Sequence, residues 1–222
     1  IFEAHGVEWT SENGDEKIGT CPFTGKKDKF YLNTKKWVWD SKTAGFGGSI
    51  STFLEKIQEM YVENMTKPLL RKLAENRGLP IEAFETQGIG WNGRQYTLLV
   101  RDPAGHCTDI RQYELGKRVM STKGVAVGLW GAEQLGKHPA DPVFLCEGEW
   151  DAIALRWLMR QVGYAGVALA LPGAGTFKDE WRPWVSSRRV HTLYDYDGPG
   201  EEGELKIQKK LKGFVQELTF VH

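Results

Sequence analysis

The sequence contains few cysteines, and their number and spacing do not form a disulfide framework. The 222 residues include 3 Cys, namely Cys21, Cys107 and Cys146. An odd count without a close pair argues against structural disulfides and for a reducing compartment. We therefore expect a cytoplasmic protein.

Long apolar runs, a net charge and a phosphate-binding loop are also missing. No stretch approaches the roughly 20 apolar residues of a transmembrane helix, and no signal peptide opens the chain, so no membrane partner is expected. The 29 Lys and Arg residues balance the 29 Asp and Glu residues, so the net charge gives no support to a nucleic-acid partner. The pattern GxxxxGK followed by Ser or Thr does not occur, which argues against a P-loop motor. The chain begins at Ile1 and ends in an apolar run, and we expect a fragment of a longer protein.

Acidic side chains follow two apolar runs in the second half of the chain. Val143–Cys146 is a predicted strand that ends at Glu147, and residues 190–194 form another that ends at Asp195 and Asp197. Ligands of open α/β sheets bind at the carboxyl ends of parallel strands, and residues i and i+2 of an extended segment point the same way. Clustered carboxylates repel unless a cation neutralises them, and oxygen ligands favour Mg²⁺ or Mn²⁺. Alternatively, the two aspartates only belong to a solvated turn between a strand and a helix and bind no metal.

The pattern around these strands predicts an α/β fold. Strands alternate with helical stretches, which is typical of a parallel sheet. The predicted elements are helices over residues 150–162, 177–185 and 201–217 and further strands over residues 167–171 and 218–221. In the third helix, Ile207, Leu211, Phe214 and the following Leu218 are expected to form the apolar face.

The acidic motifs resemble a known module. EGEWDA at residues 147–152, followed by DYDGPG at residues 195–200, resembles the TOPRIM module of DnaG-type primases, topoisomerases and some nucleases, and LPGAGTF at residues 171–177 is similar to a primase loop. The resemblance implies that Glu147, Asp195 and Asp197 are catalytic and hold Mg²⁺ or Mn²⁺, with two ions expected. Glu147 is either a metal ligand or the base for a 3′-hydroxyl, and Asp151 is a catalytic carboxylate that orients a ligand or a metal-bound water.

Residues 1–64 are predicted to form a small β-ribbon domain. A polar turn between residues 29–32 and 37–39 predicts a hairpin, and a helix over residues 49–61 follows with Ser49 or Ser51 as its N-cap. The segment resembles the zinc ribbon of primases, but of the four ligand positions only Cys21 keeps its type, and Thr24, Ser41 and Ala44 occupy the others. A structural zinc site needs four Cys or His ligands, so we expect no zinc.

This N-terminal domain has two possible roles. Lys29 and Trp39 are predicted to contact a single-stranded template, because basic and aromatic side chains together attract phosphates and stack on bases. The alternative is a solvated hairpin whose aromatic residues form its own core.

Residues 65–140 resemble the basic subdomain that precedes TOPRIM in primases. A helix over residues 69–77 and two strands over residues 96–100 and 108–113 are expected. By this resemblance, basic side chains contact template or nucleotide phosphates. The strongest candidates for these contacts are Arg111 and Lys117, followed by Arg118 and Lys123, and Arg101 is a further candidate. Each could equally be an ordinary surface charge.

The resemblance implies a DNA primase that makes short RNA primers on single-stranded DNA by two-metal nucleotidyl transfer. Its fold would be a TOPRIM parallel-sheet module over residues 141–222, preceded by a mixed α+β basic subdomain and the β-ribbon domain. Single-stranded DNA and ribonucleoside triphosphates would be its partners, with room for a replicative helicase in cis or in trans. A zinc-free module leans towards a phage or mobile element. The alternatives are a TOPRIM nuclease and a non-catalytic DNA-binding primase relic attached to a helicase.

Overall fold

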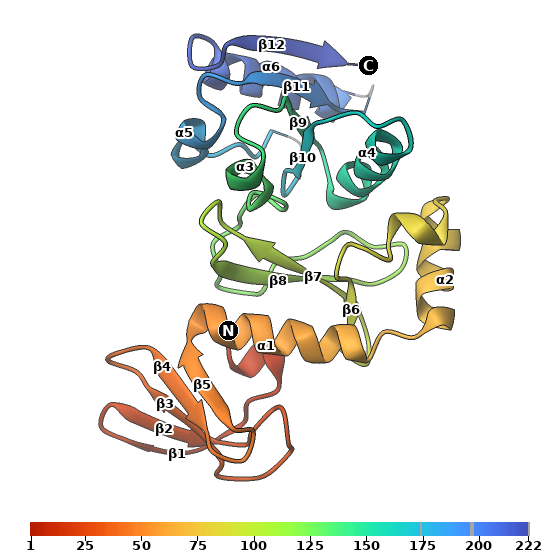
Figure 1. The fold of residues 1–222 in the computed structure, drawn as a ribbon. Helices are drawn as coiled ribbons and strands as arrows, with labels where there is room; N and C mark the ends of the chain where they lie inside the picture. The colour runs from red at the N-terminus through yellow and green to blue at the C-terminus, as the bar shows by residue number, and fades with distance from the viewer. Residues whose placement is uncertain (174, 196–197, 222) are drawn as a thin grey trace. The chain divides into compact units, whose positions relative to one another are not determined.

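A computed structural model describes residues 1–173, 175–195 and 198–221 of the chain (Figure 1). The chain forms two compact units, each built from separate segments. The first contains Ile1–Thr66, Gly88–Leu99 and Cys107–Ala126, and the second contains Lys67–Gln87, Val100–His106 and Val127–His222. The three-part division expected from the sequence stays a prediction. None of the described helices has the length and apolar character needed to cross a membrane.

An antiparallel five-stranded sheet occupies the start of the first unit. Its strands follow one another in sequence order, each paired with the next. Their bounds are Trp9–Asn13 (β1), Glu16–Gly19 (β2), Phe30–Asn33 (β3), Val38–Ser41 (β4) and Phe46–Ser49 (β5), after a short 3₁₀ helix at Glu3–His5. The hairpin of β3 and β4 confirms the one predicted from the polar turn.

Helix α1 (Ile50–Glu63) follows directly from β5. Ser49 caps it, since its hydroxyl accepts a hydrogen bond of 3.3 Å from the Thr52 amide, as the sequence predicts. Its apolar face buries Phe53, Leu54 and Ile57 against the five-stranded sheet. A second sheet of three strands, Gly90–Trp91 (β6), Tyr96–Arg101 (β7) and Cys107–Tyr113 (β8), includes both strands expected in this region. Helix α1 packs on β8 as well, so Ile110 joins the same core.

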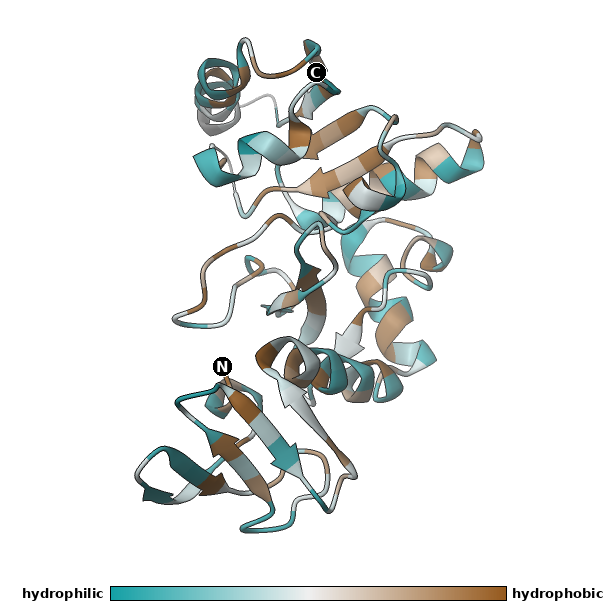
Figure 2. Cartoon of the chain, turned by 60° about the vertical axis from the view of Figure 1, so that its left-hand side comes forward, coloured by the Kyte–Doolittle hydropathy of each residue, from teal (hydrophilic) through white to brown (hydrophobic). Residues whose placement is uncertain are grey.

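A four-stranded sheet lies at the centre of the second unit, in the order β10-β9-β11-β12. Every pairing in it is parallel, which confirms the predicted α/β class. The strands are Val143–Cys146 (β9), Val167–Ala170 (β10), Arg189–Leu193 (β11) and Glu217–Val221 (β12). Figure 2 shows that the central strands are among the most hydrophobic parts of the chain.

Helices cover both faces of this sheet, as its apolar strands require. The helices of the unit are α2 (Lys67–Arg77), α3 (Gln134–Lys137), α4 (Glu149–Gln161), α5 (Arg182–Val185) and α6 (Gly198–Leu211), with 3₁₀ turns at Ile81–Ala83 and Asp179–Trp181. Side chains of α3, α5 and α6 share one core with Val143 and Leu145. Helix α4 packs on β9 and β10 on the other face, where Phe144 points.

Two predicted helices are shorter than expected. The helix expected over residues 201–217 ends at Leu211, because Gly213 adopts a left-handed conformation with φ of 82° that stops it. Ile207 and Leu211 are buried as predicted, but Phe214 lies beyond the helix and is 47% exposed. The helix expected over residues 177–185 is a 3₁₀ turn followed by the single turn of α5, which starts at the residue before Pro183.

Candidate active site

Carboxylates follow the carboxyl ends of two neighbouring strands of the parallel sheet. Cys146 at the end of β9 is paired with Leu193 at the end of β11. Glu147 is the next residue after β9, and Tyr194 and Asp195 are the next two after β11. The register therefore brings Glu147 and Asp195 to the same edge of the sheet, as predicted.

Asp151 joins this edge through the first turn of α4. Its Oδ2 accepts a hydrogen bond of 3.1 Å from the amide of Gly148, the N-cap residue of the helix. Asp151 is an exposed residue, but neighbouring atoms partly desolvate its carboxyl group. This desolvation raises the pKa of Asp151, and the negative charge of Asp195 raises it further. Asp151 and Asp195 therefore lie close enough to repel each other.

The residues next to these carboxylates, Tyr194, Cys146 and Thr192, are buried. Tyr194 is 7% exposed, and burial raises its pKa, with further contributions from the charges of Glu147 and Glu204. Burial also raises the pKa of the Cys146 thiol to about 12, so this cysteine stays protonated at neutral pH. Behind them, the Thr192 hydroxyl donates a hydrogen bond of 2.9 Å to Glu204 on α6.

Arg77 is a charged neighbour of the carboxylates that the sequence analysis did not select. Its guanidinium carbon lies 5.4 Å from the ring centroid of Trp150, and its positive charge lowers the pKa of Asp151 against the larger effect of burial. The only sequence signal is its place at the end of a predicted helix, before Gly78. Nothing in the sequence shows that this helix end reaches α4.

The donor set at this edge suits a divalent cation. Carboxylate oxygens are hard ligands, and a cation between Asp151 and Asp195 would relieve their repulsion. Asp197, a predicted metal ligand, lies outside the described residues. Among the residues that the structure does describe, no three His, Cys, Asp or Glu side chains group closely enough to hold an ion.

Trp39, predicted to stack on template bases, is a core residue of the first unit. It is 3% exposed, and its indole N–H donates a hydrogen bond of 2.8 Å to the carbonyl of Ser49. Phe30 and Phe23 stack on it, with ring centroids 5.3 and 5.7 Å away. No ring face remains for a base, so the stacking role of Trp39 is corrected to a structural one. The exposed aromatic residues of the hairpin are Trp37 and Tyr31, 53% and 36% exposed.

Arg111, predicted to contact a phosphate, is also buried. It is 1% exposed in β8, and burial lowers its pKa to about 10 while the charge of Asp109 raises it. Because a buried guanidinium cannot reach a phosphate at the surface, this assignment is corrected to a charge inside the first unit.

The other predicted basic residues have open positions or local partners. Lys117, Arg118 and Lys123 are exposed on the segment after β8, and Lys117 forms an ion pair of 2.9 Å with Glu114. Lys29 is exposed just before β3. Arg101, at the end of β7, donates a hydrogen bond of 3.0 Å to the carbonyl of Gly105 within its own turn.

No protein-family model matches the sequence, and no curated protein matches it. Solved structures do match. The zinc-binding and RNA polymerase domains of the Aquifex aeolicus primase align with 99% of this chain and 75% of that chain, at 15% identity and a TM-score of 0.50. A DNA primase domain from Pseudomonas aeruginosa aligns with 77% of this chain and 70% of its own, at 19% identity and a TM-score of 0.56.

A third match is the DnaG primase catalytic domain bound to single-stranded DNA. It covers 72% of this chain and 65% of that chain, at 16% identity and a TM-score of 0.56. At these identities the likeness concerns the fold. The chain has the fold of a DnaG-type primase catalytic core.

Proposed function

We propose that this protein is a DNA primase, which synthesises short RNA primers on single-stranded DNA. One observation carries the proposal: Glu147, Asp151 and Asp195 lie at the same carboxyl edge of a parallel sheet in a chain with a primase-core fold. Catalytic and ligand-binding groups of open α/β sheets belong at this edge.

The carboxylates would carry the chemistry of nucleotidyl transfer. Glu147, Asp195 and Asp197 would hold two Mg²⁺ or Mn²⁺ ions, which would neutralise the charge that develops on the transferred phosphate. Asp151, fixed by its hydrogen bond from the Gly148 amide, would orient a ligand. Glu147 could alternatively accept the proton of the attacking 3′-hydroxyl. Arg77 adds a positive charge beside Asp151 that suits a triphosphate.

Single-stranded DNA and ribonucleoside triphosphates are the proposed substrates. A structural neighbour is a DnaG primase domain bound to single-stranded DNA, which supports the template class. Lys117, Arg118 and Lys123 are exposed and are the proposed phosphate contacts, with Lys29 and Arg101 as further ones. A helicase partner stays a prediction.

Primer synthesis on circular single-stranded DNA tests the proposal. The chain is incubated with Mg²⁺ or Mn²⁺ and labelled ribonucleotides, beside Glu147→Gln and the matched control Glu202→Gln, which removes an exposed carboxylate from α6. We expect short labelled products with the unaltered chain and Glu202→Gln, and at least a hundredfold loss with Glu147→Gln.

Other outcomes separate the alternatives. Cleavage of the DNA without primers, abolished by Glu147→Gln, would identify a nuclease. DNA binding without synthesis or cleavage, in the chain and in any longer form of the protein, would identify a non-catalytic relic. Equal synthesis by Glu147→Gln would refute the proposed site.

A further inference from the structure

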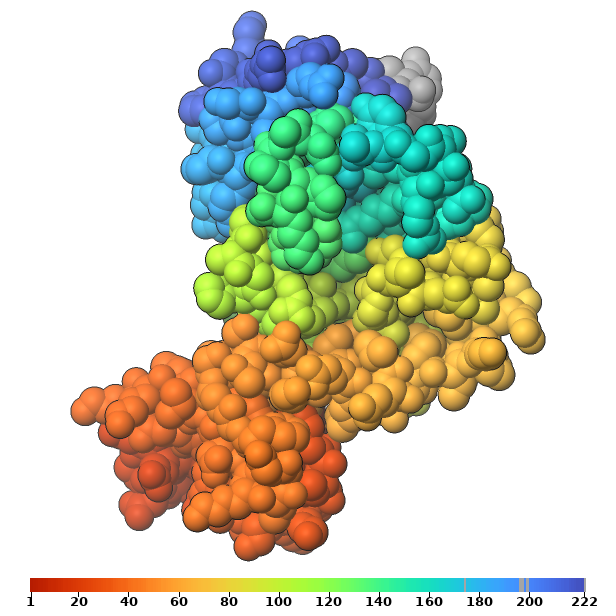
Figure 3. Space-filling view, viewed as in Figure 1, coloured from red at the N-terminus to blue at the C-terminus, as the bar shows by residue number. Residues whose placement is uncertain are grey.

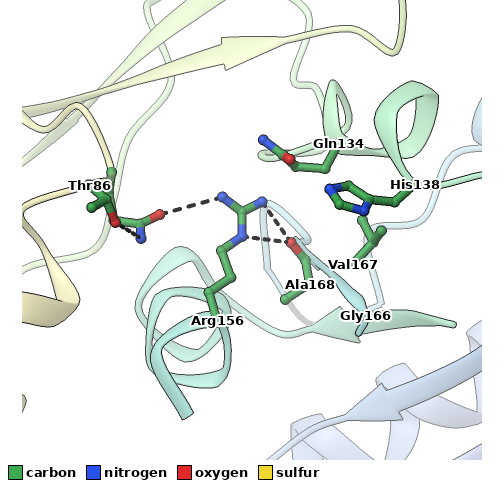
Figure 4. Close-up of a pocket in the computed structure, with 8 residues that line it drawn as sticks. Thr86, Gln134, His138, Arg156, Gly166, Val167 and Ala168 are labelled. Carbon is green, nitrogen blue, oxygen red and sulfur yellow. Dashed lines mark hydrogen bonds between the residues drawn. The ribbon is translucent and has the colours of Figure 1, made fainter. Parts of the chain in front are cut away.

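The second unit contains a polar cavity that is separate from the carboxylate edge. Its volume is about 210 Å³, and Thr86, Gln87, Gln134, His138 and Arg156 contribute polar side chains to it (Figure 4). The backbone at the beginning of β10, Gly166 to Ala168, completes the lining. Because β9, β10 and β11 are parallel, the beginning of β10 lies at the opposite end of the sheet from Glu147 and Asp195.

A buried positive charge faces this cavity. The Arg156 guanidinium donates two hydrogen bonds to the carbonyl of Ala168, from Nε at 3.2 Å and from Nη2 at 2.8 Å, and a long one of 3.5 Å from Nη1 to Gln87. Its carbon lies 4.1 Å from the ring centroid of Trp130. Burial lowers the pKa of Arg156, while the charge of Glu133 raises it. The two groups that accept hydrogen bonds from Arg156, the Ala168 carbonyl and the Gln87 amide, are both uncharged.

Arg156 retains unused donor capacity. A guanidinium carries five N–H groups, and these contacts occupy three of them. In the part of the chain that the structure describes, Arg156 forms no ion pair with a carboxylate. The Glu133 carboxylate acts on this charge only from beyond hydrogen-bonding distance, so the remaining N–H groups can donate to an anion in the cavity.

The fold leaves room for this guanidinium. Gly131 has φ of 88°, and a Cβ at this position would lie 2.0 Å from Nη2 of Arg156. Any side chain there would displace the guanidinium from its contact with Ala168. The absence of a side chain at Gly131 therefore allows the Arg156 guanidinium to lie beside the cavity.

Thr86 and His138 add further hydrogen-bonding groups to the cavity. Thr86 Oγ1 accepts hydrogen bonds of 3.2 Å from Arg160 and from Gln87, so its own O–H is left to donate. Nδ1 of His138 donates a hydrogen bond of 3.1 Å to a carboxylate oxygen of Asp141, which leaves Nε2 of the neutral ring as an acceptor for a ligand O–H. Figure 3 shows α4 (turquoise) at the surface beside the segment around Thr86 (yellow), to which Arg160 is bonded.

We propose that this cavity binds a phosphate group. A tetrahedral oxyanion offers several acceptors to the donors of Arg156 and Thr86, the O–H of a hydrogenphosphate can donate to Nε2 of His138, and the negative charge would compensate the guanidinium. Because Arg156 and Arg160 both bridge α4 to residues 82–87, an occupied cavity would hold this segment more firmly against the helix. The group could be a free phosphate ion or the phosphate of a nucleotide.

Phosphate titration of the whole chain tests this assignment. Thermal unfolding is followed in EDTA with increasing inorganic phosphate, against sodium chloride of equal ionic strength. We expect a saturable rise in Tm with phosphate and a smaller, non-saturating change with chloride. Thr86→Val and His138→Ala, which leave the guanidinium and its contact with Ala168 in place, should each weaken phosphate binding about tenfold.

The controls locate the site and identify the source of the phosphate. Glu147→Gln and Lys212→Ala should bind phosphate as the unaltered chain does, because neither side chain lines the cavity. A nucleoside monophosphate that binds more tightly than inorganic phosphate would assign the site to nucleotides, and equal binding would assign it to the free ion. No saturable effect of phosphate, or an effect unchanged in both Thr86→Val and His138→Ala, would overturn the proposal. None of these outcomes depends on primase activity.

Discussion

The hydroxyl of Ser41 donates a hydrogen bond of 3.3 Å to the sulfur of Cys21, and both side chains are completely buried. Burial alone would raise the pKa of Cys21, but hydrogen bonds from Ser41 and Thr24 outweigh it and lower the pKa. Thr43 extends the network, since its hydroxyl lies 3.4 Å from that of Ser41 and 3.3 Å from that of Thr24. Hydroxyl and thiol groups thus connect the two loops that the ligands of a zinc ribbon would connect.

This convergence predicts that three substitutions create a zinc site. Thr24→Cys, Ser41→Cys and Ala44→Cys would add three thiols to Cys21, two of them in this hydroxyl network and one at Ala44, which packs against the same core. Tetrahedral zinc needs four such ligands. We expect one zinc per chain in the triple variant and none in the unaltered protein, measured by atomic absorption after dialysis.

The double variant Thr24→Cys with Ser41→Cys is the matched control, because it supplies only three thiols. It should retain much less zinc than the triple variant. Zinc in the unaltered chain would refute the prediction that the protein lacks this metal. No zinc in a folded triple variant would show that the four positions do not converge in solution.

Trp39 and Trp37 should differ sharply in their effect on stability. Trp39→Ala removes a buried indole between Phe23 and Phe30 and is expected to cost about 3–5 kcal/mol, as for other buried aromatic residues. Trp37→Ala changes an exposed side chain and should alter stability by about 0.5 kcal/mol or less. Urea unfolding of both variants measures the difference, and similar losses would contradict the core assignment of Trp39.

The sequence predicts the elements around the carboxylates because their signals are local. The apolar runs that become β9 and β11 end at acidic residues, and Ser49 stands directly before the apolar periodicity of α1. The burial of Trp39 could not be predicted from local signals. In Trp37-Val38-Trp39 the alternation of a strand separates the faces, but it does not show which tryptophan faces the core.

Arg111 could not be assigned from the sequence for a different reason. An arginine in a strand usually faces solvent, and nothing local in the sequence shows that tertiary packing leaves this one only 1% exposed. Arg77 and Asp151 likewise meet only through the tertiary fold. The apolar spacing continues past Leu211 and therefore predicted Phe214 on the helix. The left-handed backbone of Gly213, which ends α6, leaves no trace in that spacing.

Arg118 and Lys123 should govern the salt dependence of DNA binding. Each phosphate contact that is lost reduces the slope of log affinity against log salt by about 1 for such a side chain. We expect Arg118→Ala and Lys123→Ala to weaken binding to single-stranded DNA at low salt and to reduce this slope by about 1 each. Lys212→Ala, an exposed lysine of the second unit, is the control. Unchanged slopes in both variants would show that these residues are ordinary surface charges.

Asp151 should make the metal-free protein less stable as the pH rises. Burial and the charge of Asp195 raise its pKa in the folded state, so the folded protein holds this proton more tightly than the unfolded chain does. The free energy of unfolding therefore falls as the pH rises from the ordinary carboxyl pKa, about 3.9, through the raised one. Asp151→Asn keeps an oxygen to accept the Gly148 amide and removes the titrating group. Its stability relative to the unaltered chain should increase across this range.

Urea unfolding in EDTA at a series of pH values between 3 and 7 measures this difference directly. A bound cation should reverse its sign, because Mg²⁺ or Mn²⁺ favours the ionised carboxylates. At neutral pH, added Mg²⁺ should therefore raise the Tm of the unaltered chain more than that of Asp151→Asn. Glu202→Gln, which changes an exposed carboxylate on α6, should show neither the pH-dependent gain nor the altered response to Mg²⁺. A difference between Asp151→Asn and the unaltered chain that is independent of pH would show that folding does not raise the pKa of Asp151.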